Sequence, residues 1–468
     1  MDTRMEGIRQ IFTDNQNRRY RFLLFAAITL LLMTGCSALK APELPPTPTL
    51  LPTAVPWQLD QTAPAGTVVD PISDVVPAVD PLIENLVNAV SQQQLMAYVQ
   101  TLQNFGTRNS FSPTDDPNFG IGAARAWIFD EFTRVGNGRL QVERQPFPLV
   151  YGNATAEQMN IIATLPGKAD NNQAIVIMAH YDNRPPDPTD GETLAPGAND
   201  NASGVALLLE SARLLSAYEW NQTIVFVALA AEEQGTLGAK AFVQNAFLQG
   251  QDIIAAFNYD AVGGRQSIPQ SARLFAPNLQ QSPSGEIARY YKYVGSLYLP
   301  MFPARVIDGL DREGRYGDHR EFVNAGLPGI RIIESEEDPD LVNSKRDRWE
   351  LIDYNYLQQV TQLNVAVTAT LAGGPTTPEI PLIEAAADTP GAYRLRWPVD
   401  PQAAGYALSF RPITQADYPP FRFVRAREAG DVALTGLDPA TTYAVSLTAL
   451  DENGRPGHFT PEVIIEGK

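Results

Sequence analysis

The sequence predicts an α/β fold in which a mostly parallel sheet is sandwiched between helices, followed by a small all-β sandwich. Two apolar runs rich in Ile and Val, 174–178 and 223–230, lack polar alternation, which is typical of parallel strands covered on both faces. A largely apolar helical segment, 205–215, lies between them. After residue 379, short alternating runs separated by turn residues predict the β-sandwich.

The N-terminus is typical of a signal peptide. Basic residues up to Arg21 precede an apolar run, 22–35, that is shorter than the roughly 20 residues of a membrane-spanning helix. The run ends in Leu32-Met33-Thr34-Gly35-Cys36, which resembles the lipobox of bacterial lipoproteins, where the cysteine is lipidated after cleavage. Cys36 is the only cysteine, so no disulfide can form within the chain. We expect residues 1–35 to be removed and Cys36 to carry a lipid; an uncleaved short anchor is the alternative.

A proline-rich segment, 36–80, follows and is expected to be an extended linker. The chain has 53 acidic against 35 basic residues, a net charge of −18, so it repels nucleic acid and anionic lipid headgroups, and neither is an expected partner. A lipid on Cys36, rather than charge, would hold the protein at the bilayer. The expected location is the extracytoplasmic face of the cell membrane.

From residue 81 to residue 373 the pattern predicts one domain of helices and strands. The predicted helices cover 82–105, 122–135, a start at 235–242, and 354–371. The predicted strands cover 140–146, 160–165, the two apolar runs, 253–259 and 330–333. A polar loop rich in prolines and acids, 183–196, is expected to be mobile or to face the substrate.

Acidic and imidazole side chains follow the predicted strands. His180 and Asp182 come directly after the first apolar run, and Glu232 and Glu233 follow the second. Because the carboxyl ends of parallel strands meet at one edge of a sheet, these side chains are expected to lie together. Asp200 stands at the start of the helix between the runs, where an aspartate is most often an N-cap.

Two later residues extend this group. Asp260 follows the strand predicted at 253–259, and His319 precedes the strand at 330–333. The chain has three histidines, and two of them stand beside carboxylates near strand ends, whereas His458 lies in a C-terminal loop and is expected at the surface. Two histidines with several separate acids are better explained by a metal site than by structural roles.

The residues of the predicted site lie in five separated motifs. These motifs are His180-Tyr181-Asp182, 197–204 (GANDNASG), 232–238 (EEQGTLG), Asn258-Tyr259-Asp260 and Gly317-Asp318-His319. Together they resemble, in order, the motifs of the M28 family of zinc aminopeptidases, over about residues 85–373. The resemblance implies a mostly parallel sheet between helices, in agreement with the pattern described above.

The resemblance also implies two zinc ions. His180 and Asp260 would bind one ion. Glu233 and His319 would bind the other, and Asp200 would bridge the two. The adjacent acids of the third motif, Glu232 and Glu233, would then differ in role, one holding metal while its neighbour faces water, and their mutual repulsion is relieved by a divalent cation.

The implied reaction is hydrolysis of the N-terminal residue of a peptide by a zinc-activated water. Glu232 would be the general base, and the carboxylate of Asp182 would orient the ring of His180. One zinc ion would hold the free α-amine. Two alternatives stay open: a single-zinc acyltransferase like the glutaminyl cyclases, which share this fold, and a binding module with an inactive site. The oligomeric state is unknown at this level.

One segment departs from the family. Members usually carry a His-Thr pair followed by an Asp after the last core strand, and this chain has Asn343-Ser344-Lys345-Arg346-Asp347 there. We expect neither Asn343 nor Ser344 to be needed as a ligand, so that only the substrate pocket changes. The acids in the preceding stretch, 334–338, would either favour amine-bearing substrates or form a solvated loop.

The C-terminal part, 380–468, follows a short linker at 374–379. Trp397 and the segment 437–445, with Tyr443 as a corner tyrosine, resemble a fibronectin type III domain, an immunoglobulin-like sandwich. It contains no catalytic constellation, so we expect a spacer or a weak contact with carbohydrate or protein.

Overall fold

The computed structural model describes residues 55–56, 76–169 and 171–468. The predicted signal peptide, Cys36 and most of the predicted linker lie outside the described residues, and these predictions stay untested. Within the described part, no helix combines the length and the apolar character needed to cross a membrane.

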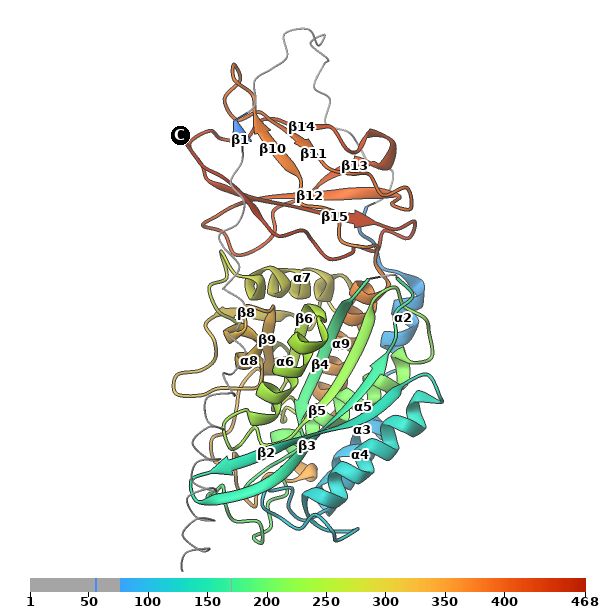
Figure 1. Ribbon diagram of the computed structural model, residues 1–468, viewed down its shortest axis with the longest axis vertical. Coiled ribbons are helices and arrows are strands. Elements are labelled where there is room, and N and C mark those ends of the chain that lie inside the picture. Colours follow the sequence, from blue (N-terminus) through green and yellow to red (C-terminus); the bar gives the residue numbers. More distant parts are fainter. Residues whose placement is uncertain (1–54, 57–75, 170) are drawn as a thin grey trace, which may run out of the picture. The chain divides into compact units, whose positions relative to one another are not determined.

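A mixed sheet of eight strands forms the centre of the larger α/β region, in the order β2-β3-β5-β4-β6-β9-β7-β8 (Figure 1). The strands are β2 (Gln141–Tyr151), β3 (Ala154–Leu165), β4 (Gln173–His180), β5 (Thr223–Leu229), β6 (Asp252–Tyr259), β7 (Ala272–Ala276), β8 (Ala304–Asp308) and β9 (Gly329–Glu334). The four central strands, β5, β4, β6 and β9, are parallel, as predicted.

The flanks of the sheet correct the prediction of a mostly parallel arrangement. β3 runs antiparallel to β5, and β7 runs antiparallel to β9, so the sheet as a whole is mixed. β2 and β3 are joined by a two-residue hairpin, which forces them to be antiparallel. The parallel centre is the part that matters for the site, because its carboxyl ends carry the candidate ligands.

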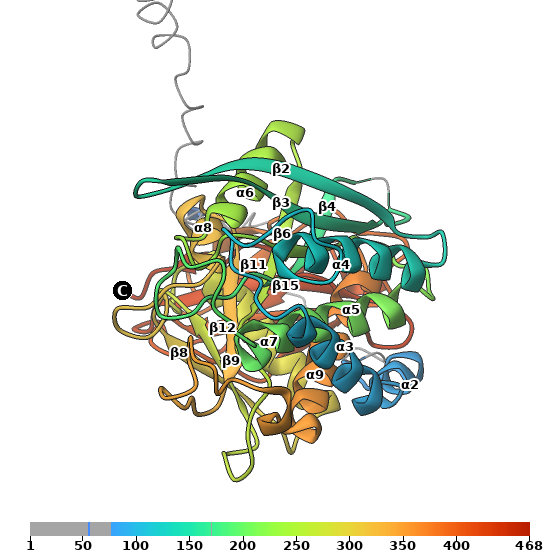
Figure 2. The ribbon, with the colours of Figure 1, turned by 90° about the horizontal axis from the view of Figure 1, so that it is seen from below.

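Helices cover both faces of the sheet, and Figure 2 shows α3, α4, α5 and α9 gathered on one side. Alternate residues of β4 pack into separate cores, with Ile175 and Ile177 on this side and Val176 and Met178 facing α6. The helices are α2 (Pro81–Asn88), α3 (Gln92–Asn104), α4 (Gly120–Gly136), α5 (Ser203–Leu215), α6 (Leu237–Gln249), α7 (Pro283–Tyr298), α8 (His319–Asn324) and α9 (Tyr354–Gly373).

The helix predicted over 82–105 is two helices, α2 and α3. The break falls at Ser91, whose side chain accepts a hydrogen bond from the backbone N–H of Gln94 at 3.2 Å and so caps α3. A short turn, Ala198–Ala202, precedes α5 and contains Asp200, whose backbone dihedral angles are not helical.

Two further four-stranded sheets lie in the C-terminal region, in the orders β1-β10-β11-β14 and β13-β12-β15-β16. Their strands are β1 (Val55–Pro56), β10 (Leu382–Ala385), β11 (Tyr393–Arg396), β12 (Gly405–Pro412), β13 (Arg422–Arg425), β14 (Val432–Leu434), β15 (Tyr443–Leu450) and β16 (Val463–Ile465). β1 pairs parallel with β10, and all other pairs are antiparallel. One short piece of the predicted linker therefore belongs to a sheet, while the fibronectin type III identity stays a prediction.

The C-terminal region packs on α7 through buried charges. Arg289 of α7 and Arg411 of β12 both pair with Glu462, at 2.9 and 2.6 Å, and all three side chains are almost fully buried. Glu286, one turn before Arg289, accepts a hydrogen bond from the backbone N–H of Glu462 at 3.2 Å. His458 is half-buried rather than at the surface, and burial lowers its pKa to about 4. The C-terminal region is thus tied to the larger α/β region by buried charges, which a simple spacer would not require.

Glu286 makes the stability of this interface dependent on pH. Burial, followed by repulsion from Glu462, raises its pKa from 4.5 to about 7. The folded state therefore keeps this proton while the unfolded state loses it, and stability falls as the pH rises from about 4.5 to 7. We predict that Glu286→Gln raises the melting temperature by a few degrees at pH 8 and by much less at pH 5, measured by calorimetry. Exposed Glu84→Gln is the control, and an equal gain at both pH values would contradict this account.

Candidate metal centre

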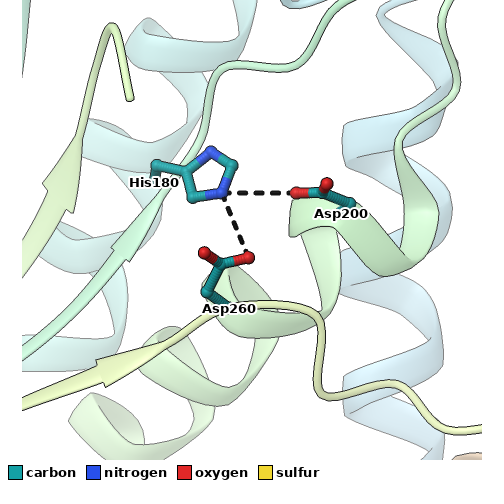
Figure 3. Close-up of side chains that lie close together, drawn as sticks. All are labelled: His180, Asp200 and Asp260. Carbon is teal, nitrogen blue, oxygen red and sulfur yellow. Dashed lines mark ion pairs between the residues drawn. The ribbon is translucent and has the colours of Figure 1, made fainter. Parts of the chain in front are cut away.

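Three side chains converge at the carboxyl edge of the parallel strands (Figure 3). Nε2 of His180, the last residue of β4, lies 3.3 Å from Oδ1 of Asp200 and 3.5 Å from Oδ1 of Asp260, which follows β6. All three ligand atoms lie within 4.8 Å of one another, and no other group of three such ligands is found among the described residues. The three residues are brought together as the sequence predicts.

The other ring nitrogen of His180 fixes what this group can bind. Nδ1 lies 3.0 Å from the backbone carbonyl oxygen of Asp182, which can only accept, so this nitrogen carries the proton of the neutral ring. The lone pair of Nε2 then faces two carboxylate oxygens, and all three atoms are acceptors. A cation between them resolves this arrangement, and one imidazole nitrogen with two carboxylate oxygens fits a catalytic zinc ion, which takes three protein ligands.

The alternative occupant of this position is a second proton on the ring. Burial lowers the pKa of His180, but the nearby carboxylates of Asp182, Asp200 and Asp260 outweigh it and raise the pKa well above 6.5. A metal ion competes with that proton for the same lone pair, so we expect zinc binding to weaken at low pH.

Asp182 supports the site differently from the prediction. Its backbone carbonyl, rather than its carboxylate, makes the hydrogen bond to the ring of His180, and Oδ1 lies 3.6 Å from Nδ1. The carboxylate oxygens accept hydrogen bonds from the backbone N–H groups of Glu232 and Glu233, each at 3.2 Å. Asp182 therefore holds the turn after β5 against the end of β4.

The charges of His180 and Asp260 act on the carboxyl group of Glu232. Burial raises its pKa well above 4.5, His180 opposes this shift, and Asp260 and Glu233 add to it. A carboxyl group whose proton affinity is raised beside a metal site is suited to accept a proton from water and to pass it on.

Glu233 is paired with residues of the chain itself. Its Oε2 accepts from Nε of Arg184 at 2.7 Å. With its amide oriented to match its neighbours, Asn343 donates from Nδ2 to Oε1 of Glu233 at 3.0 Å and accepts from Nη2 of Arg184 at 3.0 Å. Asn343 thus contacts Glu233, an expected zinc ligand, so its segment reaches the metal site as well as the substrate pocket.

His319 does not join Glu233 in the structure. It is the first residue of α8 and is fully buried, with Nε2 2.6 Å from the carbonyl oxygen of Leu310 and Nδ1 without a hydrogen-bond partner in the described part. Burial lowers its pKa to about 4. The position of α8 therefore directs the ring of His319 toward the loop that contains Leu310. The second set of zinc ligands implied by the resemblance is not assembled.

Several buried residues that position the site were not recognised from the sequence. The carboxylate of Asp347 accepts the backbone N–H groups of Asn199 and Asp200, at 2.7 and 2.9 Å, and so sets the turn that carries one ligand. Arg331 of β9 pairs with Oδ2 of Asp260 at 2.9 Å. Asp347 could have been recognised from the sequence, because it lies in the segment where family members usually carry an Asp. Arg331 lies inside an apolar strand, and nothing in the sequence indicates its role.

A buried arginine ties three segments together beneath the metal group. Arg108 donates to the backbone carbonyls of Tyr181, Pro196 and Gly197, at 2.8, 2.9 and 2.8 Å. It therefore joins the end of β4 to the turn before Asp200. Nothing in the local sequence around Arg108 marks it as part of the site.

Two of the acids of 334–338 pair with arginines, and Glu334 accepts hydrogen bonds from Asn199 and from the backbone N–H of Gly264. Glu337 pairs with Arg273 at 2.7 Å and with Arg312, and Glu336 pairs with Arg265 at 3.0 Å. A pocket beside Asp200 is lined by both kinds of charge. Its charged residues are Asp200, Arg265, Arg312, Arg315, Arg331, Glu334, Glu337, Asp338 and Asp347.

Comparison with known proteins identifies relatives of the chain. The sequence model described as "Peptidase family M28" matches residues 160–368, a range that contains every predicted metal ligand. A "Probable zinc metalloprotease" of Pyricularia oryzae is 32% identical over 67% of this chain and 70% of its own length. Another, of Leptosphaeria maculans, is 30% identical over 73% of this chain and 88% of its own length.

Two solved structures share the fold. LapB from Legionella pneumophila superposes with a TM-score of 0.52 at 22% identity, covering 63% of this chain and 75% of its own. The LapA aminopeptidase of the same organism gives 0.51 at 19% identity, covering 62% and 74%. At these identities the likeness shows the fold alone.

Removal of a ligand should separate direct from indirect contributions to metal binding. We predict that Asp200→Ala loses most of its zinc, because one of three ligands is gone. Asp347→Ala keeps all three and should weaken zinc binding by about 10- to 100-fold, since only the turn is loosened. Zinc content by mass spectrometry and affinity by chelator competition measure both effects. Glu192→Ala in the neighbouring exposed loop is the control; wild-type affinity in a folded Asp200→Ala variant would refute the assignment.

Proposed function

The chain belongs to peptidase family M28 and is a zinc metallopeptidase, and from this premise we propose that it is an aminopeptidase acting on peptides. The observation that carries the proposal is the group of His180, Asp200 and Asp260 with Glu232 beside it. All parts of a hydrolytic centre with one metal ion are present, which argues against a binding module with an inactive site.

The chemistry divides between the metal and the chain. Bound by the three ligands, zinc would polarise the scissile carbonyl and make a water molecule more acidic. Glu232 takes the proton of the attacking water and delivers it to the leaving amine. The backbone contact of His180 with Asp182 holds the ring so that Nε2 points at the metal position.

The second zinc ion implied by the resemblance does not fit the residues present. Its expected ligands are Asp200, Glu233 and His319, but Glu233 is paired with Arg184, and His319 is bonded to the carbonyl of Leu310. We therefore assign no step to a second metal ion.

We also propose the location expected from the N-terminal sequence. The lipobox-like segment ending at Cys36 supports a lipid anchor at the extracytoplasmic face of the cell membrane. Incorporation of labelled palmitate into the wild type, but not into Cys36→Ser, tests the anchor. Equal labelling of both proteins would contradict it.

The described residues assemble one metal site, and the glutaminyl cyclase-like acyltransferases use a single zinc ion. The acyltransferase therefore stays a second candidate function. A panel of aminoacyl-anilides and an N-terminal glutaminyl peptide, assayed with the full chain with and without chelator, distinguishes the two functions. An aminopeptidase releases aniline from free amino termini and ignores N-acetylated substrates. Release of ammonia from the glutaminyl peptide without peptide cleavage would favour the acyltransferase.

Glu232→Gln tests the role of the base. The amide keeps the shape of the side chain but cannot accept the proton, so hydrolysis should fall by about 10²- to 10⁴-fold while zinc content stays the same. Turnover of an aminoacyl-anilide and zinc content are measured on the same sample, with Glu84→Gln, exposed on α2, as control. Near-normal turnover of Glu232→Gln would rule out this assignment.

A further inference from the structure

The surroundings of Glu233 require a positive charge. Its side chain is 9% exposed, and the negative charge of Asp200 acts on it. A buried carboxylate stays charged only when a cation or hydrogen-bond donors balance it. In the resemblance, a second zinc ion would balance this carboxylate together with the bridging aspartate. Without that ion, another group of this chain must balance the negative charge of Glu233.

Arg184 provides that charge. Its guanidinium is always protonated and donates from Nε to Oε2 of Glu233 at 2.7 Å. A second edge of the same group is held by the loop, since Nη1 donates to the carbonyl oxygen of Pro186 at 3.1 Å. The side chain is therefore fixed from both sides, and it is 23% exposed.

Asn343 completes the arrangement. Its amide bridges the remaining oxygen of Glu233 and Nη2 of Arg184, each at 3.0 Å, which closes a ring of three side chains. The three residues come from distant parts of the sequence, at 184, 233 and 343, yet each satisfies the other two. Family members usually carry a histidine and a threonine where this chain has Asn343 and Ser344.

We propose that this chain binds one zinc ion and that Arg184, supported by Asn343, occupies the place of the second. Two carboxylates alone, Asp200 and Glu233, are fewer than the three protein ligands of a catalytic zinc site. A guanidinium offers no lone pair to a metal, and the amide oxygen of Asn343 is occupied by Nη2 of Arg184. Arg184 is a positioning residue: it neutralises Glu233 and keeps the turn after β5 in place.

The inference rests on the proposed function and narrows it. A guanidinium repels an ammonium group, so the α-amine of a substrate is not bound at this position.

The number of zinc ions per chain tests the proposal directly. The full chain is saturated with zinc, freed of loosely bound metal by gel filtration, and analysed by mass spectrometry. We expect one zinc ion in the wild type and two in Arg184→Ala/Asn343→His, which removes the guanidinium and supplies an imidazole. Asn343→His alone should still bind one. The control, Arg346→Ala/Asn355→His, makes the same two changes at exposed positions and should also bind one.

Two zinc ions in the wild type would overturn the proposal while leaving the hydrolytic function intact. A folded double variant that still binds one ion would overturn the role of Arg184. If the double variant does not fold, titration of the metal-free wild type with Co²⁺, followed by visible absorption, decides: an end point at one equivalent supports the proposal, and an end point at two contradicts it. If the wild type binds one zinc ion but does not hydrolyse peptides, the proposed function is refuted instead.

Discussion

The hydrogen bond between Nδ1 of His180 and the carbonyl oxygen of Asp182 determines what the site can bind. It places the proton of the neutral ring on Nδ1 and leaves the lone pair of Nε2 facing Asp200 and Asp260. Without a cation, three acceptors would face one another in a buried place, at a considerable electrostatic cost. The same residue, through its carboxylate, holds the turn of Glu232 and Glu233, so the base and the metal ligands share one support.

The buried centre carries many carboxylates, and the chain balances them with its own cations. Arg331 pairs with Asp260, and Arg184 pairs with Glu233. Arg331 contacts Oδ2 of Asp260 and leaves Oδ1 facing Nε2 of His180, whereas Arg184 and Asn343 occupy both oxygens of Glu233. The side of the site facing His180 is therefore the place where a metal ion is still needed. The protein thereby reduces the number of metal ions its centre requires without reducing the number of acids in it.

The sequence predicts most of what depends on local pattern. The central strands are apolar because both faces are covered, so the sequence predicts β4, β5, β6 and the ligands at their ends, whereas it does not predict the short strands β7 and β8 or the helix α7 between them. The ring of Arg184, Glu233 and Asn343 could not be predicted, because it joins three distant positions and each has an ordinary local role. The contact of His319 with the carbonyl oxygen of Leu310 could not be predicted either, because a motif indicates proximity to a sheet edge but not the direction in which a short helix turns a ring.

Crystals of the full chain grown with zinc, measured on both sides of the zinc absorption edge, test the central claim most directly. The account predicts one anomalous peak, within bonding distance of Nε2 of His180 and of the carboxylates of Asp200 and Asp260, with Arg184 still paired to Glu233. A second peak between Asp200 and Glu233, or no peak beside His180, would contradict it.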